Sequence, residues 1–150
     1  MEEKVNGFES FLNQINIKFF IEEISDFENK IAEMKWSKKE ILGHLIDSGI
    51  NNLQRFTEIQ FLEKPYKIRP YNQDELVKAN NYQNKNSQEL FELWFQLNLQ
   101  LLHVIKNQTK ETLAYQLILP NGNHTNLQFL IEDYFDHFYY HLKQINPRWI

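Results

Sequence analysis

The sequence predicts an all-α protein: a four-helix bundle with a short extra helix and a small loop or hairpin before the last helix. Glycine and proline are scarce, with four of each in 150 residues, so few positions interrupt a helix. Bulky apolar residues, including 12 Phe, recur at three- and four-residue steps in four long segments. Helices with one apolar face bury it against each other, and this length is enough for one domain over residues 1–150.

Two helices are expected in the N-terminal part of the chain. The first runs from about residue 7 to 34, with room for a bend over residues 20–25, and its apolar residues at helical spacing are Phe8, Leu12, Ile15, Phe19, Ile24, Phe27 and Ile31. The second begins after Ser37, because residues 37–40 have the capping-box pattern, in which the serine hydroxyl accepts a free N–H and Glu40 reaches back. It should run to about Leu62, before Pro65.

The middle of the chain is interrupted by prolines before it becomes helical again. A short helix is expected over residues 73–82, after Pro70. The third long helix follows a cap at Ser87, and its apolar stripe consists of Leu90, Trp94, Leu97, Leu101 and Val104.

The pattern changes again before the last helix. Residues 115–119 have extended character, and residues 120–123, Pro-Asn-Gly-Asn, form a strong turn signal, so a hairpin or ordered loop is expected there. Residues 125–128 resemble a second capping box that opens the fourth helix. This helix should end near Ile145, before Pro147.

The composition excludes some classes of binding partner for the chain. The net charge is -4 and the basic residues are scattered, which argues against nucleic acid as a partner. No apolar run approaches the roughly 18 residues that span a bilayer, and the acidic N-terminus lacks the pattern of a signal peptide, so a cytoplasmic protein without membrane contact is expected. Because the chain has no cysteine, any thiol chemistry would need a thiol that the substrate brings.

Three histidines form the main functional signal. His137 and His141 are four residues apart, a spacing that places both side chains on one face of a helix. With a third imidazole from a facing helix, for which His44 lies on a suitable face, they would make three neutral nitrogen ligands and leave one coordination position open. His103 projects opposite the apolar stripe and His124 falls in the turn, so both are expected at the surface.

Three blocks of sequence resemble the DinB-like (YfiT-like) family of metal-binding four-helix bundles. The first is Trp-Ser-Lys-Lys-Glu-Ile-Leu-Gly-His-Leu-Ile-Asp-Ser at residues 36–48, continuing through Asn51, Asn52 and Arg55. The second is Tyr-Asn-Gln-Asp-Glu-Leu at residues 71–76, and the third is the closing His-x-x-x-His-x-x-Gln-Ile within residues 136–145. The blocks occur in the order that the family shows, and together they extend over nearly the whole chain.

The resemblance implies a divalent metal held by His44, His137 and His141, an up-down-down-up order of helices, and a homodimer. Some members of this family are S-transferases or isomerases that use a small thiol such as bacillithiol or mycothiol. Two departures affect the rim of the pocket: Gly49 stands where an acidic residue often follows, and Leu76 replaces a tryptophan. The identity of the substrate is therefore not carried over.

The spacing of the histidines excludes two kinds of metal site. A zinc peptidase helix needs a glutamate directly after its first histidine, and here Phe138 follows His137. A di-iron bundle needs glutamates three residues before its histidines, where this chain has Ile41, Tyr134 and Phe138. A site of three imidazoles without a built-in base suits thiol transfer, because the metal itself deprotonates a bound thiol.

Three further residues are candidates for a catalytic role. Asp47 is one turn from His44, where it would act as a base or hold a ligating imidazole. Tyr134 could touch a ligand, although an aromatic residue at a stripe position more commonly packs in the core. Arg55 shares a face with His44, where it would bind an anionic group of the substrate or, as we favour, pair with a carboxylate of the bundle.

These residues support more than one function. The first hypothesis is a metal-dependent enzyme that transfers a bacillithiol-type thiol to an electrophilic small molecule. The alternatives are a non-catalytic metal-containing bundle that binds a small ligand, a metal-dependent hydrolase, and a dimerising bundle whose metal site has decayed. Three imidazoles suit zinc or nickel first, and iron or copper next.

Overall fold

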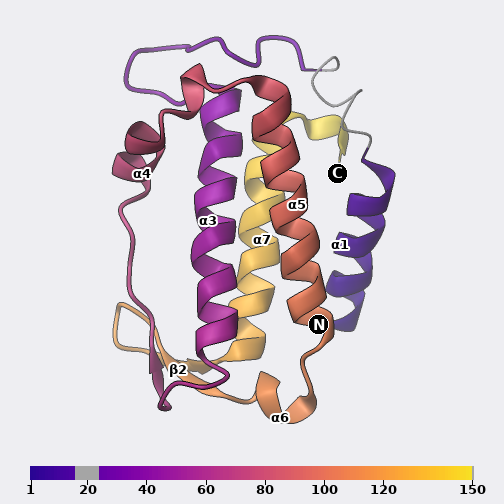
Figure 1. The fold of residues 1–150 in the computed structure, drawn as a ribbon, viewed down its shortest axis with the longest axis vertical. Coiled ribbons are helices and arrows are strands. Elements are labelled where there is room, and N and C mark those ends of the chain that lie inside the picture. The colour runs from indigo at the N-terminus through magenta and orange to yellow at the C-terminus, as the bar shows by residue number, and fades with distance from the viewer. Residues whose placement is uncertain (16–23, 150) are drawn as a thin grey trace.

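Residues 1–15 and 24–149 are described by a computed structural model, drawn as a ribbon in Figure 1. The four long helices are α1 (Glu2–Gln14), α3 (Lys38–Glu58), α5 (Ser87–Lys106) and α7 (Leu127–Ile145). The shorter elements are β1 (Tyr66–Lys67), α4 (Gln73–Asn80), the 3-10 helix η1 (Tyr82–Asn84), α6 (Lys110–Leu113), β2 (Gln116–Ile118), β3 (His124–Asn126) and the 3-10 helix η2 (Pro147–Trp149).

The long helices form a bundle in which α1 and α7 run in one direction and α3 and α5 in the other (Figure 1). Helix α3 packs against both α5 and α7, and α1 packs against α5 and α7. Because α3 and α5 are parallel, the chain between them must return along the whole bundle, and it carries β1, α4 and η1 on the way. The expected four-helix bundle with up-down-down-up order is confirmed.

The core of the bundle is rich in aromatic rings. Trp94 of α5 stacks on Phe138 of α7, with centroids 5.6 Å apart and planes 9° from parallel. Phe8 of α1 meets the edge of the same Phe138 ring at 5.0 Å. Rings from three helices thus interlock around Phe138, which fixes the depth and rotation of α7, the helix that carries two of the histidines.

Helix α3 begins as the sequence predicts. Ser37 is its N-cap: the hydroxyl accepts from the N–H of Glu40, and the Glu40 carboxylate accepts from the N–H of Ser37. The helix ends at Glu58, and residues 59–62 form turns instead of the last helical turn that was expected. The start of this helix, which positions His44, therefore follows from a local signal.

The prediction of one helix over residues 7–34 was wrong at Ile15, where α1 has ended, and over residues 24–34; residues 16–23 lie outside the described chain. Residues 25–28 form a turn in which Asp26 has φ 64°, and residues 29–36 are irregular. The backbone carbonyl of Phe27 accepts from the N–H of Lys39, so this segment is tied across the start of α3. Ile31, 90% exposed, continues the apolar spacing without being buried. Most of the expected bend lies outside the described residues.

The connections confirm several local predictions and correct others. The short helix is present as α4, and β2 and β3 form the expected antiparallel hairpin. The cap of α5 is Asn86, one residue before the expected Ser87, and Asn126 caps α7 in place of the expected box from Thr125. The strand β1 was not predicted; it pairs in parallel with β2 and completes a three-stranded sheet at one end of the bundle.

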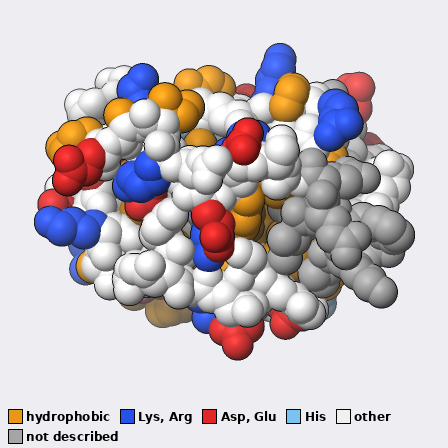
Figure 2. Space-filling model, turned by 90° about the horizontal axis from the view of Figure 1, so that it is seen from above, with side chains coloured by type: hydrophobic (Ala, Val, Ile, Leu, Met, Phe, Trp, Pro, Cys, Tyr) orange, Lys and Arg blue, Asp and Glu red, His pale blue; other side chains and the backbone are white. Residues whose placement is uncertain are grey.

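Charge is mixed on the end of the bundle that Figure 2 shows. Figure 2 looks onto the end of the bundle where α3 and α5 begin, and acidic and basic side chains alternate over the visible part of that end. Within the described ranges, no helix combines the length and apolar character that crossing a bilayer requires.

Candidate metal centre

The structure brings His44, His137 and His141 together between α3 and α7. One ring nitrogen from each lies within 4.8 Å of the other two, and Nε2 of His44 is 3.1 Å from Nε2 of His137. The His44 side chain is only 1% exposed, whereas His137 and His141 are half-buried, so the cluster reaches the surface on the side of α7. Three imidazoles thus converge on one point, which is enclosed on the side of α3 and partly exposed on the side of α7.

The helices place these side chains through their spacing and direction. His137 and His141 are one turn apart on α7, and their rings lie 4.6 Å apart at 68°. Helix α3 runs antiparallel to α7 and brings His44, in its second turn, opposite both rings at 4.7–5.0 Å. The Trp36 ring, just before the α3 cap, also packs against His44, with ring centroids 4.9 Å apart, and helps to exclude water from it.

Neighbouring polar groups orient two of the three imidazoles. Nδ1 of His141 lies 2.9 Å from Oε1 of Gln144, an acceptor, so the proton belongs on Nδ1 and the lone pair on Nε2. Nδ1 of His137 lies 3.4 Å from the hydroxyl of Ser48 on α3. Nδ1 of His44 is buried, and among the described residues it has no hydrogen-bond partner. Two of the three histidines therefore have the kind of hydrogen-bonding partner that metal-binding histidines usually have.

Burial keeps all three histidines neutral near pH 7. Burial, together with the neighbouring His141 and His137, lowers the pKa of His44 to about 3. Burial and the neighbouring His141 lower the pKa of His137 to about 4. Burial also lowers the pKa of His141, and its hydrogen bond to Gln144 opposes that shift. A neutral imidazole is the form that binds metal ions.

The donor set fits a divalent metal. Zinc–nitrogen bonds are about 2.0–2.1 Å long, so two nitrogens on a tetrahedral zinc are about 3.3 Å apart. The 3.1 Å between the Nε2 atoms of His44 and His137 is close to that value, and it also permits an N–H···N hydrogen bond between the two rings. Because the atoms lie within 4.8 Å of one another, the arrangement does not favour a decayed site.

Asp47 lies near His44 in sequence but faces the crossover chain. Its Oδ1 accepts from the hydroxyl of Tyr82 at 2.7 Å and from Nδ2 of Asn80 at 2.8 Å. Burial raises the pKa of Asp47, and these two hydrogen bonds oppose the shift. Asp47 therefore anchors the chain between α4 and α5 against α3, and its hydrogen bonds do not reach the histidines.

Tyr134 belongs to the core. Its side chain is 2% exposed, and its hydroxyl donates to Oδ1 of the buried Asn98 at 2.7 Å. Phe8 and Phe56 pack against its ring. The packing interpretation that the sequence favoured describes this residue, and no hydrogen bond joins it to the histidine cluster within the described chain.

Arg55 is half-buried near the far end of α3. Its Nη2 donates to the backbone carbonyl of Arg69 at 2.9 Å, and its guanidinium lies over the Tyr71 ring at 5.4 Å. The favoured pairing with a carboxylate is not seen: in residues 1–15 and 24–149, no carboxylate oxygen lies within 4.0 Å of Arg55.

For the other residues near the site, the sequence provided little or no indication of their contacts with the histidines. Ser48 lies one turn after His44 and on its side of the helix, but only the packing of α7 shows that it meets His137. The contact of Trp36 with His44 has no local signal. His103 and His124 are exposed, as expected. Asp136, which precedes His137, forms a surface ion pair with Lys4 at 2.6 Å.

Comparisons with known proteins identify the fold. No family model matches the chain, and no curated protein does. Among solved structures, YfiT from Bacillus subtilis, described as a probable metal-dependent hydrolase with an unusual four-helix bundle topology, superposes with a TM-score of 0.81 at 17% identity, over 97% of this chain and 83% of YfiT.

A mycothiol-dependent maleylpyruvate isomerase superposes with a TM-score of 0.66 at 11% identity, over 97% of this chain. The chain spans 57% of that larger protein. At these identities the likeness concerns the fold. The chain has the four-helix-bundle fold of the DinB-like proteins.

Proposed function

We propose that the chain is a metal-dependent enzyme whose divalent metal is bound by His44, His137 and His141. The observation that carries this proposal is the convergence of three neutral imidazole nitrogens within 4.8 Å, on the partly open side of a packed bundle. Zinc or nickel suits three imidazoles best, and iron or copper follows. Both structural neighbours are described as metal- or thiol-dependent proteins, which supports chemistry of this kind at the same fold.

A divalent metal held by three imidazoles supplies a Lewis acid with an open position, which lowers the pKa of a thiol or water that binds there. The chain contributes the orientation of the ligands. Gln144 and Ser48 hold His141 and His137 through their Nδ1 atoms, so that both Nε2 atoms face the centre. Trp36 covers His44 and keeps that side of the site dry.

Transfer of a small thiol is the reaction that this environment supports best. Among the described residues no carboxylate forms a hydrogen bond or ion pair with the three histidines, so the site offers no built-in general base. A thiol has an ordinary pKa of about 8.5 and needs far less help than water to become a nucleophile. Its sulfur would bond to the electrophilic carbon, its proton would pass to solvent, and the displaced group would leave with its electron pair.

Hydrolysis is the second candidate. It is favoured by the superposition on YfiT, a probable metal-dependent hydrolase, over nearly the whole chain. A non-catalytic bundle that binds a small ligand is the remaining alternative, and it is consistent with the same absence of a base.

One assay separates these functions. Protein loaded with zinc or nickel is mixed with bacillithiol and monochlorobimane, and separately with p-nitrophenyl acetate. We expect thiol-dependent bimane fluorescence that His44→Ala abolishes and that the matched control His103→Ala, a change at an exposed histidine, leaves intact. Ester hydrolysis without thiol transfer would identify the protein as a hydrolase. Metal binding without thiol transfer or ester hydrolysis would support the non-catalytic bundle that binds a small ligand.

A further inference from the structure

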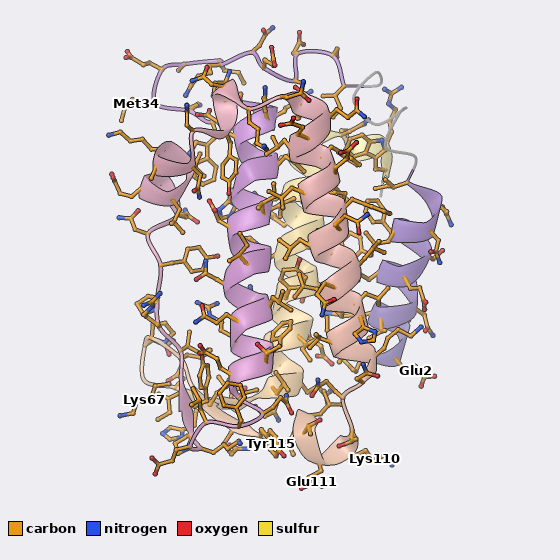
Figure 3. The ribbon with its side chains drawn as sticks, viewed as in Figure 1. Glu2, Met34, Lys67, Lys110, Glu111 and Tyr115 are labelled. Carbon is orange, nitrogen blue, oxygen red and sulfur yellow. The ribbon has the colours of Figure 1, made fainter. Side chains whose placement is uncertain are left out.

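A second polar cavity lies on the same side of α3 as the metal centre, toward the other end of the helix. It has a volume of about 310 Å³ and lies between the C-terminal half of α3 and the chain that follows it. Helix α3 contributes Asn51, Arg55 and Glu58 to its wall, and the later chain contributes Tyr66, Lys67 and Arg69. Figure 3 shows Lys67 at this lower side of the bundle.

The cavity has an excess of positive charge. Arg55, Lys67 and Arg69 face a single carboxylate in its wall, that of Glu58. Glu58 already accepts from the Tyr66 hydroxyl at 2.8 Å and from an amide N–H of α3. Across the described ranges, none of the three cations has a carboxylate within ion-pair distance. These cations are therefore available to an anionic ligand.

Arg55 is held in place before any ligand binds. Its guanidinium is fixed by the carbonyl of Arg69 at 2.9 Å and by the face of Tyr71 at 5.4 Å. Burial lowers its pKa, and Tyr71, Tyr66 and the more distant Asp133 oppose that shift. A planar guanidinium that is already oriented and partly desolvated binds carboxylate or phosphate oxygens better than a mobile surface cation does.

Two observations connect this cavity with the metal centre. Arg55 is 11 residues after His44, which places it on nearly the same face of α3 and about 16 Å along the helix axis, whereas Asn51 is about 10 Å away. A chain of polar contacts, buried at Asn52 and partly buried at its two ends, also links the two sites. Asn52 donates to Ser48, which meets His137, and Arg55 lies 3.4 Å from Oδ1 of Asn52.

The chain that follows α3, from β1 to α4, also connects this cavity with the metal centre. Tyr66, Lys67 and Arg69 line the cationic cavity, and a few residues later Gln73 and Asp74 line a cavity of about 270 Å³ beside the metal centre. The 270 Å³ cavity is also lined by Trp36 and Gln144, the neighbours of His44 and His141. The chain between β1 and α4 runs beside α3 in Figure 1, so it extends from one cavity to the other.

We propose that the cationic cavity is an anion-binding subsite for the far end of the substrate. The substrate is then an elongated molecule with its reacting group at the metal centre and a carboxylate or phosphate about 10–16 Å away. This assignment rests on the proposed function for the reacting end, but the binding of an anion in the cavity does not depend on a metal.

The first test therefore uses metal-free, EDTA-treated, full-length protein. Succinate and inorganic phosphate are titrated separately and followed by NMR chemical shifts. We expect saturable binding of at least one anion, weakened at least tenfold by the double change Lys67→Gln/Arg69→Gln at two exposed positions. The matched control Lys110→Gln removes an exposed cation on the opposite side of the lower end, and it should leave binding unchanged (Figure 3). Absence of saturable binding, or equal binding in the double variant, would overturn the subsite.

The second test asks whether the subsite serves the metal centre. With metal-loaded protein and monochlorobimane, the KM for bacillithiol, which carries carboxylates, should rise at least tenfold in the double variant while kcat stays within twofold. Cysteamine, which carries none, should react equally with both proteins. An equal change for both thiols would contradict the assignment. If no thiol reacts, the proposed thiol transfer fails, and the metal-free titration still decides whether the anion subsite exists.

Discussion

Replacing Gly43 by alanine should destabilise the protein, because the ring of Tyr82 occupies the space that a side chain would need. A Cβ at Gly43 would overlap Cγ and Cδ2 of Tyr82 and lie 2.8 Å from its Cβ. Ordinary contact begins at 3.4 Å, so Tyr82 must retreat by at least 0.6 Å at its Cβ and by more at its ring atoms, and rotation of the ring about the Cβ–Cγ bond moves neither Cβ nor Cγ. The retreat also stretches the 2.7 Å hydrogen bond from the Tyr82 hydroxyl to Asp47.

The size of the effect follows from these contacts. Overpacking costs about 1–3 kcal/mol. A lost hydrogen bond to a buried charged group adds about 1.5–3 kcal/mol, part of which arises from the same displacement. Alanine stabilises a helix by about 0.5–1 kcal/mol relative to glycine, which offsets part of this loss. We expect a net loss of about 2–4 kcal/mol, which lowers the urea midpoint by roughly 1–2 M.

The assay is urea unfolding of metal-free protein, followed by circular dichroism. Gly7→Ala in α1 is the matched control, because a Cβ there meets nothing within 4 Å and should stabilise the protein by about 0.5–1 kcal/mol. The two substitutions are chemically identical and should change the free energy of unfolding in opposite directions. A Gly43→Ala variant as stable as the wild type would refute the close approach of η1 to α3.

Two further predictions concern buried polar groups. Tyr134→Phe should cost about 1–3 kcal/mol because it leaves Oδ1 of Asn98 buried without its donor, and adding Asn98→Leu should restore part of that loss in urea unfolding. Metal-free protein should lose stability as the pH falls from 6.5 toward 3, because burial holds the pKa of His44 at about 3 in the folded state and the unfolded chain takes up a proton near 6.5. The loss from His44 is about 2 kcal/mol at pH 5, so His44→Asn should flatten the pH profile of urea unfolding; parallel profiles would contradict the burial of a neutral imidazole.

The parts of the fold that the sequence predicted depend on local signals. The capping box at Ser37 is complete within four residues, and the turn over residues 120–123 leads directly into the hairpin. The spacing of His137 and His141 already places both on one face of α7. These features needed no knowledge of distant contacts, and the structure contains each of them.

Features that depend on distant contacts were missed. The apolar spacing of Ile24, Phe27 and Ile31 imitates a helix, but a carbonyl of this segment pairs with Lys39, and Asp26 adopts a left-handed conformation. Two residues of β1 pair with Leu117 and Ile118, about 50 positions later, and so short a strand has no pattern of its own. A homodimer, a cytoplasmic location and a single domain stay predictions that other measurements must test.

The sequence predicted that the three histidines lie together, as the structure shows, but not what surrounds them. A helical wheel gives the direction of a side chain but not its depth, so Tyr134 could be placed near the interior without showing that Phe8 and Phe56 enclose it. The direction of Asp47 depends on Tyr82, which arrives 35 residues later. The cationic cavity requires the chain after β1 to return to Arg55, and that return follows from the crossover between parallel helices.

Anomalous diffraction from crystals of zinc-loaded protein tests the metal centre most directly. We expect one zinc peak per chain, about 2.0–2.1 Å from a nitrogen of each of His44, His137 and His141. His137→Ala should remove the peak, and His103→Ala should retain it. Zinc bound in stoichiometric amount at another place, or no zinc bound at all after saturation, would contradict the central claim.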